Sequence, residues 1–114
     1  MPIRGRWSPS RLKTLYRLIF DDRALKEFRK LGTTIQRQFQ KRLNERLINP
    51  RVPADRLSSL DNCYKIKLRA SGYRMTYQVK DDIVSVVVIA VGQRDSGKED
   101  SYDDARKRLA TRSD

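Results

Sequence analysis

The chain has 114 residues, of which 26 are Lys or Arg and 14 are Asp or Glu, so its formal net charge is +12. This length suits one domain with a modest hydrophobic core, and this charge indicates a partner such as nucleic acid or an acidic protein surface. The chain contains no histidine, which excludes His-based metal sites and catalytic triads that use an imidazole. Acid–base chemistry would therefore fall to Lys, Tyr, Asp or Glu.

Cysteine content and hydrophobicity bear on where the protein works. The single cysteine, Cys63, cannot form an internal disulfide and suits a reducing compartment. No run of residues approaches the roughly 18 apolar residues of a membrane span, and the first ten residues lack the apolar segment of a secretory signal. We therefore expect a cytoplasmic protein without a membrane partner.

The N-terminal part of the chain reads as an extension followed by a strand. Residues 1–13 hold four basic residues, two prolines and a glycine but no acidic residue, which predicts a flexible basic extension before a domain over residues 14–114. Residues 14–20 are β-branched and aromatic enough to predict a strand. Asp21 and Asp22 then provide a helix N-cap and a negative first turn.

Two helices in an antiparallel hairpin should come next. The first presents one apolar face and should end at Gly32. The second should be capped by Thr33 or Thr34, repeats apolar residues at i, i+4 spacing, and ends at Asn49 before a proline. Their outer surface is basic, and we expect it to be a solvated face: Arg29, Lys30, Arg37, Lys41, Arg42 and Arg46.

Residues 63–79 predict a β-hairpin, because they alternate between apolar and polar, reverse at Ser71-Gly72, and alternate again. With a two-residue turn, Arg69 would face Arg74 and Lys67 would face Thr76. One face of the hairpin is then apolar and must be buried. The other carries only positive charge, although like charges side by side destabilise a sheet, from Lys65, Lys67, Arg69 and Arg74.

Residues 83–91 are apolar at nearly every position, which predicts a strand that is central in its sheet or covered on both faces. A polar loop and a short helix over residues 103–110 follow. The expected order is β-α-α-β-β-β-α. This is an α+β fold in which a small, mostly antiparallel four-stranded sheet packs against an N-terminal helical hairpin.

The basic face has the groups that cleavage of RNA by its own 2′-hydroxyl needs. Lys65 and Lys67 leave the same face of one strand, and two such close ammonium groups repel, so one can exchange a proton. The guanidinium groups of Arg74 and Arg94 can hold phosphate oxygens, and Tyr102 can stack on a base. Judged by residue spacing alone, the basic face could be a phosphate-binding surface, a solvated face or a catalytic site.

Three stretches carry a resemblance to a known family: residues 22–32, residues 88–94, and the run Cys-Tyr-Lys-Ile-Lys-Leu-Arg that starts at Cys63 and leads into a Ser-Gly-Tyr-Arg turn. The chain resembles the RelE toxins of bacterial type II toxin–antitoxin systems from about residue 14 to residue 110. The resemblance implies an endoribonuclease that cleaves messenger RNA in the ribosomal A site without a metal or other cofactor. It also implies neutralisation by a RelB-like antitoxin, with which such toxins bind operator DNA.

The resemblance places the active-site lysines at Lys65 and Lys67, the phosphate-binding arginines at Arg74 and Arg94, and a C-terminal tyrosine at Tyr102. We expect Lys67 to transfer a proton, Lys65 and Arg74 to hold the phosphate, Arg94 to stabilise charge or contact the leaving group, and Tyr102 to stack. Which group is the base and which the acid stays open. Further RNA contacts are expected from Arg56, Arg69 and Lys98.

The chain departs from the family pattern at three places: Ser58 and Gln93 stand where basic residues are frequent, and the segment before Tyr102 is longer than usual. Two other functions remain as alternatives. One is inhibition of DNA gyrase, as in the ParE branch of the superfamily. The other is a regulator that binds nucleic acid without cleaving it, whose binding would fall steeply with salt.

Overall fold

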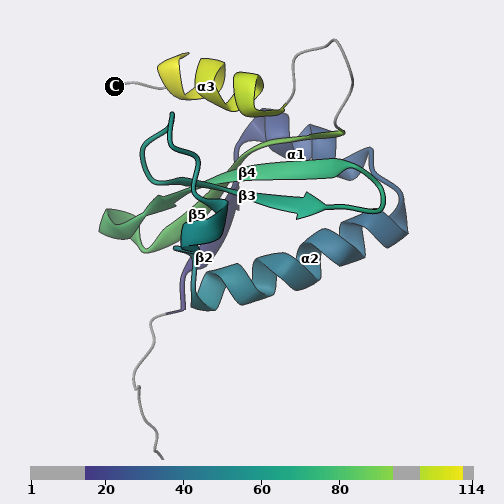
Figure 1. The fold of residues 1–114 in the computed structure, drawn as a ribbon, viewed down its shortest axis with the longest axis horizontal. Helices are drawn as coiled ribbons and strands as arrows, with labels where there is room; N and C mark the ends of the chain where they lie inside the picture. Colours follow the sequence, from purple (N-terminus) through teal and green to yellow (C-terminus); the bar gives the residue numbers. More distant parts are fainter. Residues whose placement is uncertain (1–14, 94–100, 112–114) are drawn as a thin grey trace, which may run out of the picture.

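The computed structural model describes residues 15–93 and 101–111, and these form an α+β fold around one sheet (Figure 1). The expected class and element order are confirmed, with short 3-10 turns at Pro53–Asp55 and Asp81–Ile83. Residues 1–13 lie outside the described residues, so the basic extension stays a prediction. The elements are β2 (Arg17–Phe20), α1 (Asp22–Arg29), α2 (Thr33–Ile48), β3 (Cys63–Leu68), β4 (Tyr73–Lys80), β5 (Ser85–Gln93) and α3 (Ser101–Thr111).

The four strands lie in the order β2-β5-β4-β3. β2 runs parallel to β5, and the other two pairs are antiparallel, so the sheet is mixed and mostly antiparallel. β5 is central, and each of its residues from Ser85 to Val91 is buried. The apolar run over residues 83–91 is therefore the core strand that the sequence predicted, although the strand begins at Ser85.

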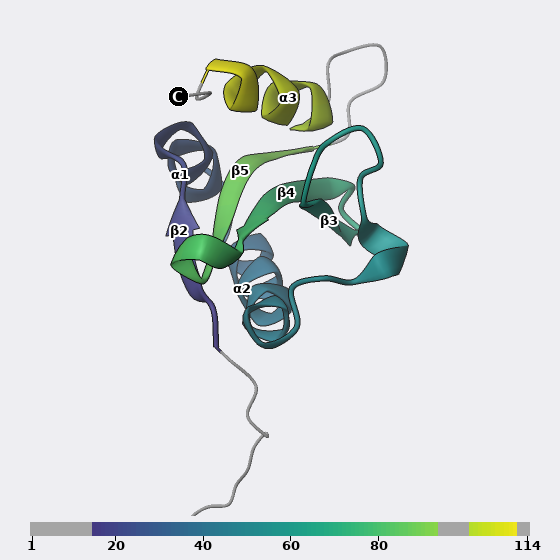
Figure 2. The same ribbon diagram turned by 90° about the vertical axis from the view of Figure 1, so that its left-hand side faces the viewer.

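Helices cover both faces of the sheet, with α3 and α2 on opposite sides (Figure 2). On the side of α1 and α2, the core includes Ala24, Phe39 and Leu43 against strand residues such as Ile66 and Tyr77. On the other side, Ala105 and Leu109 of α3 pack on Val87, Ile89 and Ala90, with Leu60 beside them. Among the described residues, no helix is both long enough and apolar enough to cross a membrane.

The junction of α1 and α2 differs from the prediction. The side chain of Asp21 caps α1 as expected, accepting a hydrogen bond from the backbone N–H of Arg23 at 2.9 Å. Gly32, however, does not end α1 in a left-handed conformation; its φ is −63°, and it is the N-cap of α2 in place of either threonine. The amide of Gln36 donates to the backbone oxygens of Phe28 and Leu31, which satisfies carbonyls at the end of α1 that a left-handed glycine would otherwise help to cap.

The hairpin register is shifted by two residues from the prediction. Lys67 lies opposite Arg74 and Lys65 opposite Thr76, so the loop is four residues long. A two-residue hairpin turn needs a positive φ at its first central residue, whereas in this loop only Gly72 has one, at +78°. The N–H of Gly72 bonds to the carbonyl of Leu68 at 2.8 Å. Arg69, which was predicted to lie opposite Arg74, is in the loop instead. Lys65, Lys67 and Arg74 still share one face because side chains repeat every two residues.

Val84, just before β5, has a left-handed φ of 48°, which is costly for a β-branched residue. Its side chain is 37% exposed, so little packing would be lost on substitution. We expect Val84→Asn to raise the free energy of unfolding by about 1 kcal/mol, measured by urea denaturation. The control is Ile83→Asn, at a neighbour that is 41% exposed but has no positive φ. Equal effects of the two substitutions would show that backbone strain is not the cause.

Candidate active site

The register places three cations together on one face of the β3–β4 hairpin. Lys67 and Arg74 are directly opposite each other, and Lys65 lies two residues along β3. Directly opposed side chains have Cβ atoms about 5 Å apart, so one phosphate group can contact both Lys67 and Arg74. Lys67 is exposed and Lys65 half-buried, while Arg74 is only 9% exposed. The pairing of Lys67 with Arg74 in place of Thr76 makes this cluster tighter than the sequence predicted.

A buried arginine supports β3 from the opposite face of the sheet. Arg46 was expected on the solvated face of α2, but it is 5% exposed, and that expectation is wrong. Its guanidinium donates to the backbone oxygen of Lys65 at 3.2 Å and to the hydroxyl of Tyr77 at 2.8 Å. It also pairs with Asp55 at 2.5 Å. Arg46 thus fixes the backbone at the first of the two lysines.

Tyr77 completes this support. Its hydroxyl donates to the backbone oxygen of Pro50 at 2.6 Å, and its ring stacks on Tyr64 with centroids 5.8 Å apart. Burial raises the pKa of Tyr77 to about 12, against the opposing effect of the Arg46 hydrogen bond. The hydroxyl therefore stays protonated and keeps its role as a donor. Arg46 and Tyr77 together hold β3 against α2 from within the core.

Two hollows meet at the tip of the hairpin. One, of about 320 Å³, lies between Lys67, Arg69 and Arg74. The other, of about 680 Å³, lies between the hairpin and α2, where Lys41 and Arg42 face Lys67 and Arg69. Lys67 and Arg69 line both hollows. Glu45 and Asp55 also line the larger hollow, so part of the surface of α2 adjoins the hairpin there through side chains of both signs.

The structure gives fewer contacts for the other predicted site residues. Arg56 is exposed, and its backbone forms an isolated bridge with Tyr64, which puts its backbone beside the edge strand β3. Arg94 and Lys98 lie outside the described residues. Tyr102 belongs to α3, but its side chain is outside the described part of the chain. Among the residues described, no three His, Cys, Asp or Glu side chains form a group that could hold a metal ion.

Gln93, one residue before Arg94, brings the end of β5 to the hairpin turn. Its backbone pairs with Tyr73, and its side-chain amide donates to the backbone oxygen of Ser71 at 3.0 Å. The sequence suggested only that a basic residue was missing at Gln93. In the structure, this side chain joins the exit of β5 to the hairpin.

Cys63 is fully buried at the start of β3, and burial raises the pKa of its thiol to about 12. A protonated, inaccessible thiol is a poor nucleophile. At pH 8 we expect a thiol reagent such as DTNB to label the native protein at least about 100-fold more slowly than the urea-unfolded chain. Complete labelling of the folded protein at the unfolded rate would show instead that Cys63 is accessible.

Comparisons with known proteins support the resemblance. A family model described as "ParE toxin of type II toxin-antitoxin system, parDE" matches residues 18–96. The mRNA interferase toxin RelE of Escherichia coli (strain K12) is 52% identical over 94 residues, which are 82% of this chain and 97% of that protein. The chain belongs to the RelE toxin family.

Solved structures of RelE agree with this assignment. The crystal structure of the isolated E. coli RelE toxin matches with a TM-score of 0.69 and 51% identity, over 82% of this chain and 98% of that chain. The toxin in the intact E. coli RelBE toxin–antitoxin complex matches with a TM-score of 0.69 and 55% identity, over 70% and 98% of the two chains. The motifs in residues 22–32, 63–79 and 88–94 therefore indicated the right family.

Proposed function

We propose that this RelE-family chain is the toxin of a type II toxin–antitoxin system and a ribosome-dependent endoribonuclease. It cleaves messenger RNA in the ribosomal A site and thereby inhibits translation. The observation that carries this proposal is the cluster of Lys65, Lys67 and Arg74 on one face of the hairpin. A relative that is 52% identical over 94 residues and is named an mRNA interferase supports it.

The proposed reaction is attack by a 2′-hydroxyl on the adjacent phosphate. The new bond joins the 2′-oxygen to phosphorus, and the bond from phosphorus to the 5′-oxygen breaks, which leaves a 2′,3′-cyclic phosphate and a 5′-hydroxyl. One group must take the 2′-proton and another must give a proton to the 5′-oxygen. Lys67 is exposed at the cluster and is our choice for one of these proton transfers.

The other cations stabilise negative charge as it grows on the phosphate oxygens. Arg74 is nearly buried, so water screens its charge less than that of an exposed arginine. Lys65, held through its backbone by Arg46, acts with Arg74 on the phosphate. Arg94 is proposed to stabilise the leaving side and Tyr102 to stack on the base. Arg56, Arg69 and Lys98 are proposed as further contacts to RNA.

The partners follow from the same proposal. The E. coli toxin is known in a complex with its RelB antitoxin, and we propose a RelB-like antitoxin for this chain. Its basic surface and net charge of +12 favour an acidic partner and long-range attraction to ribosomal RNA. With the antitoxin, the protein would also bind operator DNA. We place its action in the cytoplasm, where ribosomes and messenger RNA are found.

The test of this function compares ribosome-bound message with free message and with DNA gyrase. Purified protein should cut the message within the A-site codon of programmed ribosomes and should leave free message whole. Inhibition of gyrase supercoiling with the message intact would favour the ParE-like alternative. Growth arrest that survives Lys67→Ala, with salt-sensitive RNA binding, would favour a regulator that does not cleave.

A further inference from the structure

One buried hydroxyl of the sheet has no hydrogen-bond partner. Thr76 lies in β4 with 0% exposure, and its Oγ1 makes no hydrogen bond to any of the described residues. A buried hydroxyl without a partner costs free energy, and valine, which has the same shape, would avoid that cost. The stability of the free protein therefore does not explain a threonine at this position.

Thr76 shares the basic face of the hairpin. It lies directly opposite Lys65 and two residues after Arg74 on β4. The backbone oxygen of Lys65 bonds to Arg46, so it points away from β4. Lys65 and Thr76 are therefore a pair without mutual backbone hydrogen bonds, the kind whose Cα atoms are only about 4.5 Å apart and whose side chains come closest.

On its other side, Thr76 faces a bulge in β5. Thr76 pairs with Ala90, and the register then shifts, so that Ile89 is an extra residue of β5. Bulges are frequent beside active sites, where they change the direction of a side chain. The side chains of Ile89 and Ala90 belong to the apolar cluster under α3, so neither can bond to the hydroxyl.

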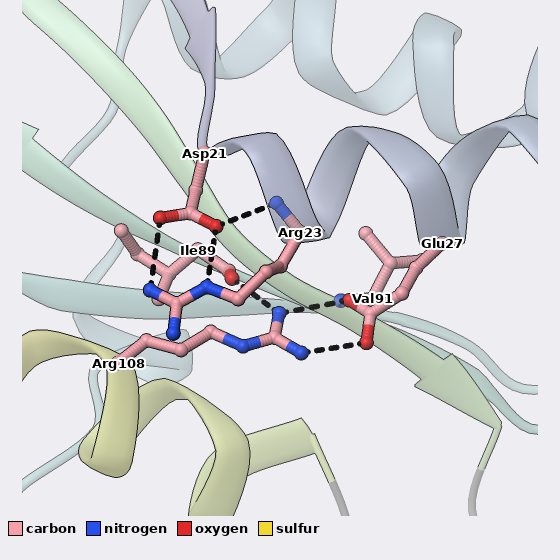
Figure 3. Close-up of polar contacts among 6 residues, drawn as sticks. All are labelled: Asp21, Arg23, Glu27, Ile89, Val91 and Arg108. Atoms are coloured by element: carbon pink, nitrogen blue, oxygen red, sulfur yellow. Dashed lines mark hydrogen bonds and ion pairs between the residues drawn. The ribbon is translucent and has the colours of Figure 1, made fainter.

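The backbone groups at this bulge are bonded to side chains from two helices (Figure 3). Arg108 of α3 donates from Nη1 to the backbone oxygen of Ile89 at 2.8 Å. Glu27 of α1 accepts at Oε1 from the backbone N–H of Val91 at 3.0 Å, and its Oε2 pairs with Arg108 Nη2 at 2.8 Å. Arg108 and Glu27, and not Thr76, therefore satisfy the backbone here, which leaves the basic face as the source of a partner for Thr76.

On the basic face, Lys65 is the neighbour best placed to be that partner. Gln78, two residues further along β4, already donates to the backbone oxygen of Asp61 at 3.3 Å. Lysine and arginine only donate hydrogen bonds, whereas a hydroxyl can accept one. Lys65 is half-buried and directly opposite, and its ammonium has no polar partner among the described residues. An acceptor and a donor, both without partners, thus face each other across the two strands.

We propose that Thr76 is a positioning residue for RNA cleavage, whose Oγ1 accepts a hydrogen bond from the Lys65 ammonium when message displaces water from the basic face. In the free protein, water solvates the half-buried ammonium. Once that water is expelled, the ammonium needs acceptors from the protein and the phosphate. With one N–H on Thr76, the other two are directed at the phosphate that Arg74 also holds. This inference rests on the proposed function.

The test is single-turnover cleavage of ribosome-bound message by Thr76→Val. The rate constant at saturating protein should fall by about 10-fold, because Lys65 loses its orientation, while the half-saturating concentration changes by less than about twofold. The urea midpoint should rise by roughly 0.5 M, because the variant no longer buries an unpaired hydroxyl. A residue with only a structural role would not lose activity while gaining stability. Thr76→Ser restores the hydroxyl and should cleave within about threefold of the wild type.

Ser85→Ala is the matched control, because Ser85 is the other fully buried hydroxyl of the described sheet and it has a partner. It is 0% exposed, and its Oγ donates to the backbone oxygen of Ile83 at 3.0 Å. Its removal should lower the urea midpoint by roughly 0.5 M and leave the cleavage rate within about twofold of the wild type. The two buried hydroxyls should therefore have opposite effects on stability and different effects on cleavage.

A double-mutant comparison tests whether Thr76 acts through Lys65. In a chain that already carries Lys65→Ala, Thr76→Val should cost less than about twofold more, because the group that it positions is gone. A wild-type rate in Thr76→Val, or an equal loss with and without Lys65, would overturn the inference and leave the proposed function standing.

The stability measurement can also overturn the inference. A lower urea midpoint for Thr76→Val, or its failure to fold, would show that the hydroxyl serves the structure of the free protein. Message left whole by the wild-type protein would instead overturn the proposed function, and this inference with it.

Discussion

Replacing Lys67 by alanine should lower the single-turnover rate of cleavage of ribosome-bound message by about 10²- to 10⁴-fold, the range for loss of a group that transfers a proton. Lys67 is exposed, so the free energy of unfolding should change by less than about 0.5 kcal/mol. The lower cleavage rate would therefore come from the missing amine and not from unfolding of the protein. Quenched-flow measurement with the protein in excess over ribosome-bound message gives the rate constant directly.

The control for this substitution is Lys26→Ala, which removes the same charge from an exposed position on α1, away from the hairpin. It should cleave at close to the wild-type rate, because it affects only long-range attraction to RNA. A Lys67→Ala protein that cleaves within about twofold of the control would show that Lys67 transfers no proton in the rate-limiting step.

The largest effect on stability is expected at Arg46. Arg46→Met keeps much of the volume but removes the donors to Lys65 and Tyr77 and leaves Asp55 without its partner. Breaking one side of a buried ion pair costs about 3–5 kcal/mol, and the Asp55 side chain is 27% exposed, so we expect about 3 kcal/mol. Urea denaturation of the purified protein measures this loss.

Arg37→Met is the matched control, because Arg37 is on the same helix and exposed; it should be neutral within about 0.5 kcal/mol. A loss below about 1 kcal/mol for Arg46→Met would mean that the buried network adds little to folding. In that case, the backbone of Lys65 would not depend on Arg46 for its position.

Much of the fold could be predicted from local patterns. Alternation over residues 63–79 showed which side chains share a face, because that depends only on the period of a strand. The apolar run before Gly92 similarly showed a central strand. Both features depend on residues that are close together in the chain, so they can be predicted from the sequence. Lys65, Lys67 and Arg74 were predicted to share the hairpin face for the same reason.

The turn register and the buried charges depend on contacts that local patterns do not contain. Arg46 bonds to a residue 19 positions away and Arg108 to one 81 positions away. A weak signal existed in both cases: Arg46 lies three residues after the buried Leu43, and Arg108 three after the buried Ala105, so each is on the inner face of its helix. A charge at such a position indicates a buried partner elsewhere.

We propose above that the hairpin cluster promotes attack by a 2′-hydroxyl on message in the A site. The most direct test uses ribosomes that hold one of two messages, identical except for a single 2′-deoxynucleotide on the 5′ side of the cleaved bond. We expect the all-ribose message to be cut to a 2′,3′-cyclic phosphate and the deoxy-substituted message to stay whole on the same complexes. Cleavage of both messages at equal rates would contradict it.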